Sequence, residues 1–257
     1  MTQEERRRRL TEELLSERAA YADIAIPEDE ESQKKLLRSL FNLRMPGAAS
    51  TAFLKLQDEY LKEEIRQKGI TRLDDLSPVR ENLYLWQGDI TTLASDAIVN
   101  AANSAMLGCF YPCHGCIDNA IHTFAGIQLR LQCEKIMQAQ GHEERTGEAK
   151  ITPAYNLPSR YVLHTVGPIV RGRVTEREGR QLASCYRSCL SLSEERGISS
   201  IAFPCISTGE FRFPNREAAK IATETVAEYR LRTHSRMKVI FNVFKNEDYD
   251  IYRELLG

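Results

Sequence analysis

The interpretation of this chain starts from residues 97–104, whose sequence is AIVNAANS. The first three residues form a short apolar run that predicts a buried strand ending at Asn100, and the residues after it place a second amide and small side chains at its carboxyl end. An asparagine amide both donates and accepts hydrogen bonds, which suits a ribose hydroxyl, but it also satisfies loop backbone without any ligand. The segment therefore predicts a buried strand that ends in a polar loop, and it leaves open whether that loop binds anything.

The chain around this segment, from Pro78 onward, alternates short apolar runs with helical patterns. The candidate strands are 83–86, 97–100, 161–165, 200–204 and 239–244, and the candidate helices are 118–140, 176–196, 216–232 and 248–256. Strands separated by helices of this length indicate βαβ units. We expect an α/β fold in which a mixed, largely parallel sheet is sandwiched between helices. Ligands of such sheets bind beyond the carboxyl ends of the strands, which directs the search to the residues after Trp86, Asn100 and Pro204.

Residues 1–80 carry helical patterns and no convincing strand. Apolar residues at helical spacing predict helices over 4–20, around 36–43 and over 51–68. We expect these residues to form a helical N-terminal extension packed on a domain of residues 81–257. Because an apolar stripe at this spacing is usually core, it predicts no chemical role for the extension.

Composition excludes several classes of protein. With 42% hydrophobic residues the chain is neither fibrous nor disordered, and no stretch approaches the roughly 18 apolar residues of a membrane span. The first ten residues carry four arginines without an apolar block behind them, so we expect a soluble, cytoplasmic protein. Thirty-five basic residues against thirty-six acidic ones leave no excess charge for nucleic acid or anionic lipid. The odd number of cysteines, seven, favours reduced thiols over disulfides.

Two of the three strand ends carry further polar residues. Residues 87–91, QGDIT, leave the carboxylate of Asp89 free either to accept a hydrogen bond from an exocyclic amine or to cap the turn. Residues 203–214, FPCISTGEFRFP, contain a Ser-Thr-Gly turn whose backbone N–H groups and hydroxyls suit a diphosphate. The alternative for this segment is an ordinary connection between a strand and a helix.

Three cysteines and a histidine fall within eight positions, residues 109–116, whose sequence is CFYPCHGC. Zn²⁺ prefers thiolate and imidazole ligands, and a catalytic zinc site uses three protein ligands and an open position. A closed structural site more often joins two separated cysteine knuckles, and the other cysteines form no second knuckle. The segment therefore favours an open metal site over a structural one or a cluster of free thiols.

The residues alone do not assign the metal ligands. The candidates are Cys109, Cys113, His114, Cys116 and His122. Neighbours in an extended loop tend to point in opposite directions, so a set with both Cys113 and His114 is disfavoured. His122 lies four residues after Asp118 and is equally suited to packing on a helix.

Four motifs occur in the order in which the macrodomain family has them. They are Gly88–Thr91, Ile98–Ser104, Ile117–His122 and Ser207–Gly209. The resemblance spans residues 81–257 and implies ADP-ribose binding. Where most macrodomains have a glycine-rich run, this chain has Cys109–Cys116. In this it resembles a zinc-dependent branch of bacterial and fungal protein-ADP-ribose hydrolases, whose members also have a helical N-terminal extension.

The resemblance assigns roles to individual residues. It implies Cys109, His114 and Cys116 as ligands of Zn²⁺, with Cys113 a bystander. It implies that Asp89 and the Ile90 amide bind adenine, and that Asn103, Asp118 and Asn119 line the distal ribose and the adjoining phosphate. The diphosphate loop that it implies consists of Ser207, Thr208, Gly209, Glu210 and Phe211, with Phe211 as a lid. It also implies that Cys116 contacts the substrate.

The function implied by the resemblance is zinc-dependent removal of mono-ADP-ribose from acidic side chains of a protein. Zn²⁺ would act as a Lewis acid toward a ribose hydroxyl or a bound water. Asn103 and Asp118 are the expected catalytic residues, and Asp118 would orient the attacking water. The branch implies a sirtuin-like ADP-ribosyltransferase as partner and a lipoyl-carrier protein as target. The alternatives are an ADP-ribose-binding module with a structural zinc, an O-acetyl-ADP-ribose deacetylase and, against the charge balance, a nucleic-acid binder.

Overall fold

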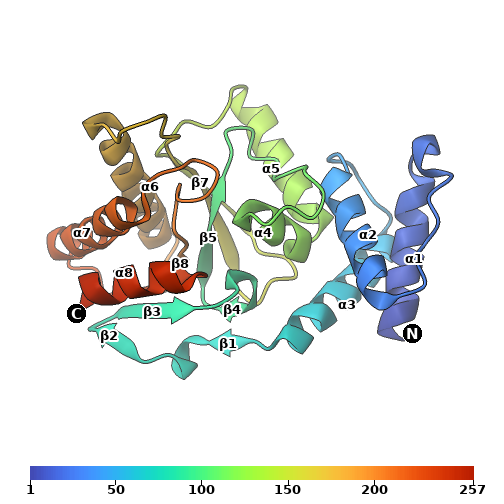
Figure 1. The fold of residues 1–257 in the computed structure, drawn as a ribbon, viewed down its shortest axis with the longest axis horizontal. Helices are drawn as coiled ribbons and strands as arrows, with labels where there is room; N and C mark the ends of the chain where they lie inside the picture. The colour runs from blue at the N-terminus through green and yellow to red at the C-terminus, as the bar shows by residue number, and fades with distance from the viewer.

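A seven-stranded sheet runs through the structure, a computed structural model that describes all residues, 1–257 (Figure 1). In spatial order its strands are β2 (Pro78–Arg80), β3 (Leu83–Gln87), β9 (Lys238–Val243), β8 (Ser200–Phe203), β5 (Ala97–Ala102), β7 (Tyr161–Val166) and β6 (Ala149–Pro153). The five inner strands pair in parallel, and the edge strands β2 and β6 pair antiparallel. The predicted α/β fold with a mixed, largely parallel sheet is therefore confirmed.

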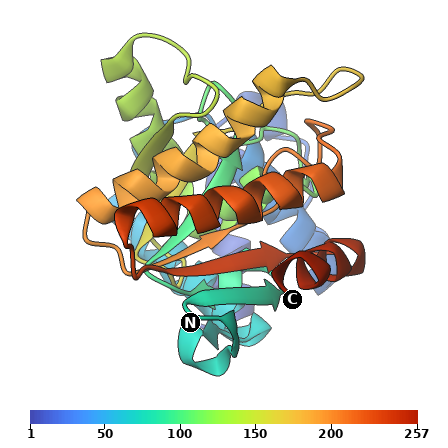
Figure 2. The ribbon, with the colours of Figure 1, turned by 90° about the vertical axis from the view of Figure 1, so that its left-hand side faces the viewer.

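Helices cover both faces of this sheet. One face carries α6 (Glu176–Glu195), α7 (Asn215–Thr233) and α8 (Asn246–Leu256), which Figure 2 shows in front, and the other carries α4 (Ile117–Ala125) and α5 (Ile127–Gln140). Adjacent residues of β5 pack against opposite faces of the sheet: Val99 belongs to the cluster with Tyr186 of α6, and Ile98 to the cluster with Ile121 of α4. A strand buried on both faces needs apolar residues at successive positions, which explains the unbroken run at 97–99.

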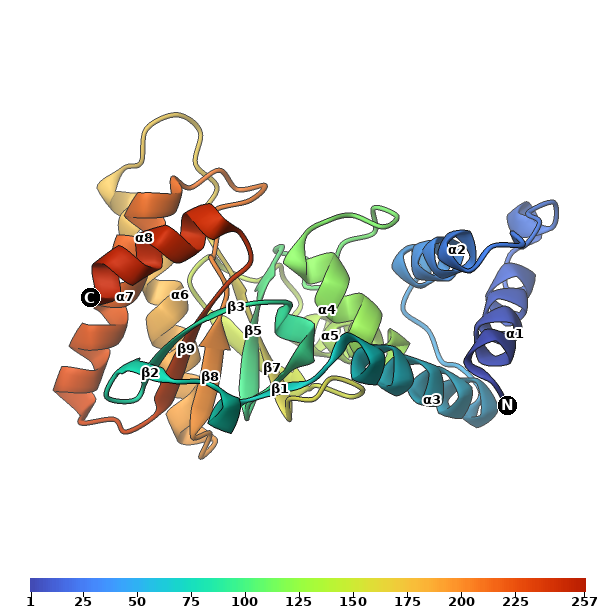
Figure 3. The same ribbon diagram turned by 60° about the horizontal axis from the view of Figure 1, so that its bottom comes forward.

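Three further helices precede the sheet: α1 (Gln3–Ser16), α2 (Glu30–Leu43) and α3 (Thr51–Lys68). Figure 3 shows them beyond α4 and α5, on the side away from α6, α7 and α8. Their apolar stripes form one cluster, which includes Leu10, Leu37 and Phe53 and extends to Ile127 of α5. The helix predicted over 51–68 is confirmed, with Ser50 as its N-cap accepting from the Phe53 N–H.

Some predicted elements differ from the observed ones. The helix predicted over 118–140 is two helices, because Gly126 adopts a φ of 96° and a Cβ there would lie 2.7 Å from Gln57 Nε2. The helix predicted over 4–20 ends at Ser16, and Ala19–Tyr21 form a separate 3-10 turn.

Several short strands leave no periodic signal in the sequence. Residues 1–80, expected to lack strands, contain β2 and β1 (Thr71–Arg72), which pairs in parallel with β4 (Leu93–Ala94). The edge strand β6 was also missed, because it is only partly buried and ends in a proline. None of the helices is both long and apolar enough to cross a membrane.

Candidate functional site

The carboxyl ends of the parallel strands bring the predicted site segments to one edge of the sheet. Residues 88–91 follow β3, residues 103–116 follow β5 and residues 204–211 follow β8. Because β3, β9, β8 and β5 are neighbours that run parallel, these three segments leave the sheet on the same side. The structure therefore gathers residues that are more than a hundred positions apart in the sequence.

The cysteine-rich loop, Cys109–Cys116, places three ligand atoms together. One atom each of Cys109, His114 and Cys116 lies within 4.8 Å of the other two, and the Cys109 Sγ to His114 Nδ1 distance is 3.7 Å. Cys116 is the N-cap of α4, and its Sγ accepts from the Asn119 N–H at 3.4 Å. Two thiolates and an imidazole at such distances are a donor set typical of Zn²⁺.

The electrostatics of these residues also fit a cation. Burial, together with the nearby charges of Cys109 and Asp118, raises the pKa of the Cys116 thiol to about 12. Because burial and the neighbouring negative groups disfavour a thiolate at Cys116, a positive charge beside its sulfur would stabilise the ionised form. The donor set therefore suits a divalent metal ion better than it suits three free side chains.

Glu210 supports His114 from the opposite side. Its Oε1 lies 3.5 Å from His114 Nε2, the ring nitrogen that faces away from Cys109. Metal-binding histidines usually donate their second N–H to a carboxylate or carbonyl, which fixes the tautomer and the orientation of the ring. The sequence predicts Glu210 as a substrate contact, whereas the structure places its carboxylate against a candidate metal ligand.

Cys113 faces away from the other sulfurs. It adopts a φ of 53°, and its Sγ donates to the Lys35 carbonyl of α2 at 3.3 Å and lies 3.3 Å from Ser39 Oγ. Cys113 therefore does not belong to the group of Cys109, His114 and Cys116, and it lies in a turn and not in the extended segment on which its predicted opposition to His114 depends.

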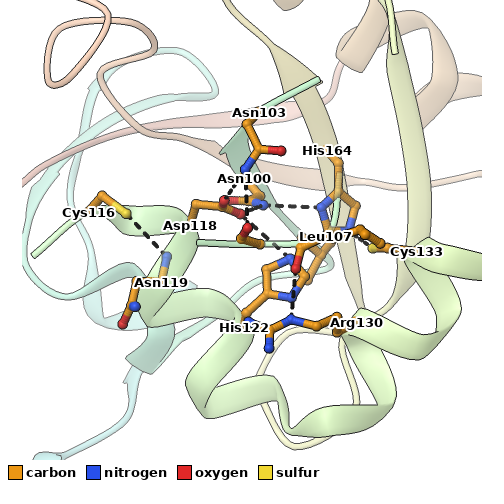
Figure 4. Close-up of polar contacts among 12 residues, drawn as sticks. Asn100, Asn103, Leu107, Cys116, Asp118, Asn119, His122, Arg130, Cys133 and His164 are labelled. Atoms are coloured by element: carbon orange, nitrogen blue, oxygen red, sulfur yellow. Dashed lines mark hydrogen bonds and ion pairs between the residues drawn. The ribbon is translucent and has the colours of Figure 1, made fainter. Parts of the chain in front are cut away.

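Asp118 is buried beside the cysteine-rich loop and is held by two amides (Figure 4). Its Oδ1 accepts from Asn100 Nδ2 at 2.8 Å, and its Oδ2 accepts from Asn103 Nδ2 at 3.3 Å. Burial raises its pKa to about 6, and the hydrogen bond from Asn100 and the charge of Arg130 oppose that shift. The two predicted catalytic residues, Asn103 and Asp118, thus lie in direct contact.

His122 belongs to a second, fully buried group with Cys133 and His164. Neither ring nitrogen of His122 has a hydrogen-bond partner, although Nε2 lies 3.6 Å from Asp118 Oδ1. Burial holds the pKa of His122 well below its usual value and lowers that of His164 to about 3, so both rings are neutral. His164 Nε2 lies 3.0 Å from Thr152 Oγ1, and its Nδ1 lies 3.2 Å from Nδ2 of Asn100, the amide that also bonds Asp118.

Asn119 is turned into the protein. It is fully buried, its Oδ1 accepts from Arg38 Nη2 at 2.7 Å, and its Nδ2 donates to the Tyr111 carbonyl at 3.0 Å. The amide of Asn119, which is predicted to contact ribose or phosphate, is therefore hydrogen-bonded to Arg38 and to the Tyr111 carbonyl. Sequence reasoning missed Arg38, because nothing local distinguishes it from the other arginines of the helical extension.

Asp89 is fixed at the end of β3. Its Oδ1 accepts from the Thr91 N–H at 3.0 Å, its Oδ2 accepts from Lys68 Nζ at 2.9 Å, and Ile90 begins the 3-10 turn Ile90–Thr92 that follows. An exposed aromatic side chain, Phe244, stands directly after β9, and its carbonyl accepts from Gln87 Nε2 at 3.2 Å. Phe244 is the last residue of the strand predicted over 239–244, whereas β9 ends at Val243 and leaves the Phe244 side chain exposed beyond it.

The loop Ser207–Phe211 follows β8. Ser207 adopts a φ of 68°, and its buried Oγ has no hydrogen-bond partner. Thr208 Oγ1 donates to the Cys205 carbonyl at 3.0 Å, and the space around the Cα of Gly209 is open. Phe211 is partly buried against a small cluster at the ends of β5 and β7 that includes Ala102 and Val166. The loop therefore combines a buried hydroxyl that has no partner with open space at Gly209.

Comparisons with known proteins point to one family. The family model described as Macro domain matches residues 99–222. A protein named "Protein-ADP-ribose hydrolase" from Treponema medium is 58% identical over the whole of both chains. A "Probable bifunctional ADP-ribose hydrolase/ADP-ribosyltransferase" from Fusarium oxysporum f. sp. cubense is 44% identical, over 88% of this chain and 41% of its own. The solved Trypanosoma brucei macrodomain in complex with ADP-ribose is similar with a TM-score of 0.67 and 30% identity, over 86% of this chain and 95% of that one.

Proposed function

The chain belongs to the macrodomain family, and from this we propose that it is a zinc-dependent hydrolase that removes mono-ADP-ribose from acidic side chains of a target protein. The relative that aligns over its whole length bears the name of a protein-ADP-ribose hydrolase. The observation that carries the proposal is the convergence of Cys109, His114 and Cys116 beside Asp118.

Cys109, His114 and Cys116 would hold the zinc ion, which when bound supplies a Lewis acid near the distal ribose. Asp89, ionised at the end of β3, accepts from the adenine amine. The Ser207–Phe211 loop takes the diphosphate through backbone N–H groups around Gly209, where the space beside the chain is open. These contacts are remote from the bond that breaks, so their binding energy fixes the anomeric carbon at Asp118.

Asp118 orients the attacking water. Asn100 and Asn103 each donate to a different oxygen of its carboxylate, and this fixes the plane of the group. Each carboxylate oxygen keeps a further lone pair to accept a hydrogen bond from a water or a ribose hydroxyl. With a pKa of about 6 the group is ionised at neutral pH and is a stronger base than an ordinary carboxylate, so it both orients the water and is suited to accept its proton.

The partners follow from the same family. We propose a mono-ADP-ribosylated protein, such as a lipoyl-carrier protein, as substrate and a sirtuin-like ADP-ribosyltransferase as the enzyme that modifies it. The fungal relative, whose name joins both activities, supports this pairing. We also propose that residues 81–257 are the ADP-ribose-binding domain and that residues 1–80 are an extension of it in a cytoplasmic protein.

The test uses the full-length, zinc-loaded protein and a mono-ADP-ribosylated protein substrate. Released ADP-ribose is measured by mass spectrometry with no chelator, after verified metal removal, and after zinc is restored. We expect release that stops on metal removal and returns with zinc. Binding of ADP-ribose without release would show a binding module, and release that persists without metal would refute the role of zinc. Turnover of O-acetyl-ADP-ribose alone would reassign the substrate.

A further inference from the structure

Helix α2 of the N-terminal extension forms several hydrogen bonds with the cysteine-rich loop. Arg38 Nη2 donates to the His114 carbonyl at 3.0 Å, and the Cys113 N–H donates to Asn42 Oδ1 at 2.9 Å. The Cys113 thiol donates to the Lys35 carbonyl at 3.3 Å. Residues separated by more than seventy positions are joined by each of these bonds. The loop that carries the candidate ligands is thus held from outside the sheet by a helix that contributes no ligand.

Arg38 also hydrogen-bonds to the side chain of Asn119, and Asn119 in turn bonds to the loop at Tyr111 and at Cys116. Its Nη2 and Nε donate to Asn119 Oδ1 at 2.7 and 3.2 Å. Because Oδ1 faces the guanidinium, Nδ2 is directed to the Tyr111 carbonyl, which accepts at 3.0 Å. The Asn119 N–H meanwhile donates to Cys116 Sγ at 3.4 Å. One arginine therefore braces the backbone at His114 and, through Asn119, the loop at Tyr111 and the cap at Cys116.

The geometry of Arg38 is specific to a guanidinium. Its acceptors are the His114 carbonyl and the Asn119 amide oxygen, and it forms no ion pair with a carboxylate. A planar fork with several donors spans two such acceptors at once, whereas an ammonium is a single point. The positive charge of Arg38 thus remains without a carboxylate partner beside a loop that contains two candidate thiolate ligands.

We propose that Arg38 is a positioning residue for the metal centre, and that through it the N-terminal extension sets how tightly the cysteine-rich loop holds zinc. The loop is irregular between β5 and α4, so its ligands must lose conformational freedom when they converge on an ion. Bonds that order the loop beforehand lower that cost, as supporting groups around metal ligands generally do. This inference rests on the zinc site of the proposed function.

The experiment compares Arg38→Met, which keeps an unbranched apolar stem and removes the donors, with Arg38→Lys. Arg44→Met is the matched control, because Arg44 is the C-cap of α2 but its side chain bonds Glu17 and the Gly47 and Ala48 carbonyls, all within the extension. The zinc-loaded full-length proteins are titrated with a chromogenic chelator, and their cobalt-substituted forms are compared by absorption. Melting temperatures report the stability of each variant.

We expect Arg38→Met to lower zinc affinity by roughly 10- to 100-fold and to change the cobalt spectrum. Arg38→Lys should fall between it and wild type, and Arg44→Met should bind zinc as wild type does even if it melts earlier. Folded Arg38→Met with wild-type zinc affinity overturns the role of Arg38. If that variant does not fold, wild-type affinity in Arg38→Lys overturns it instead. Wild-type protein that binds no zinc refutes the metal site itself, which separates the two failures.

Discussion

Lys68, in the last turn of α3, donates to Oδ2 of Asp89 at 2.9 Å, so the N-terminal extension reaches the carboxylate expected to bind adenine. The same ammonium lies 3.5 Å from the centroid of the Phe124 ring, which fixes it from a second direction. Burial alone would raise the pKa of Asp89, but hydrogen bonds from Thr91 and Lys68 outweigh it and hold that pKa below its usual value. The carboxylate is therefore an ionised, oriented acceptor.

Replacing Asp89 should weaken nucleotide binding without touching the metal. Asp89→Ala removes a charged acceptor, and hydrogen bonds to charged groups contribute about 1.5–3 kcal/mol, so we expect ADP-ribose affinity to fall about 10- to 100-fold. Lys68→Met, which leaves the carboxylate but frees it, should cost only a few-fold. Calorimetry measures both, with zinc content as the control. Unchanged affinity in Asp89→Ala would mean that adenine binds elsewhere.

The cysteine-rich loop contains its own matched pair of variants. Cys116→Ser removes a candidate ligand and should lower zinc affinity by more than the roughly 10- to 100-fold that follows loss of a supporting group. Cys113→Ser should bind zinc in full, because the Cys113 thiol donates to the Lys35 carbonyl instead. Elemental analysis of the purified proteins distinguishes them. A metal-free Cys113→Ser protein with a metal-loaded Cys116→Ser protein would exchange the two assignments.

The pKa of Asp118 predicts an acidic limit to activity. Protonation removes the negative charge and turns one oxygen into a donor, so the group can no longer hold and activate the water as a base, and kcat should fall as pH drops through about 6, or through a lower value if zinc stabilises the carboxylate. Asp118→Asn should lower kcat at all pH values and abolish this limb. A pH profile of single-turnover release measures both, and an unaltered acidic limb in the variant would assign it to another group.

The raised pKa of Asp118 also makes the stability of the protein depend on pH, in the opposite direction to a salt-bridged carboxylate, whose pKa is lowered. The folded pKa of Asp118, about 6, lies above its ordinary value of 3.8, so folding favours the protonated form. The zinc-free protein should therefore lose stability as pH rises from about 4 to about 6, and Asp118→Asn should remove that loss. Urea unfolding at the two pH values tests this. A wild-type stability that rises over this interval by the same amount in the variant would contradict it.

Two glycines test whether the Ser207–Phe211 loop binds the diphosphate. A Cβ on Gly167 would overlap Ser207 Oγ, so Gly167→Ala should displace the loop and lower both stability and ADP-ribose affinity. A Cβ on Gly209 meets no protein atom within 4 Å, so Gly209→Ala should keep the wild-type melting temperature and lose affinity about 10-fold if a diphosphate approaches that backbone. Wild-type affinity in Gly209→Ala would place the diphosphate away from Gly209.

The parallel strands, and the edge of the sheet where the candidate site lies, could be predicted from the sequence because they depend on patterns among neighbouring residues. An unbroken apolar run such as 97–99 identifies a strand buried on both faces, and parallel strands with intervening helices put their carboxyl ends on one side. The density of thiols at 109–116 likewise needs no structure to be noticed. These features depend on neighbouring residues alone.

What the sequence missed depends on contacts between distant segments. Arg38 and Lys68 look like ordinary surface cations of a helix, and only docking of the extension brings them to Asn119 and Asp89. The break at Gly126 is of the same kind, since Gln57 of α3 is what leaves no room for a side chain there. Glu210 reaches His114 across two loops that follow different strands.

A shortened version of the chain that began at residue 81 would retain the five parallel strands but lose Arg38 and Lys68 together. Compounds ranked for inhibition against such a fragment would meet the proposed adenine site without the Lys68 ammonium, and the candidate metal site without the hydrogen bonds from Arg38. Screening campaigns should therefore use all 257 residues, because the fragment would select molecules for a site that lacks these contacts.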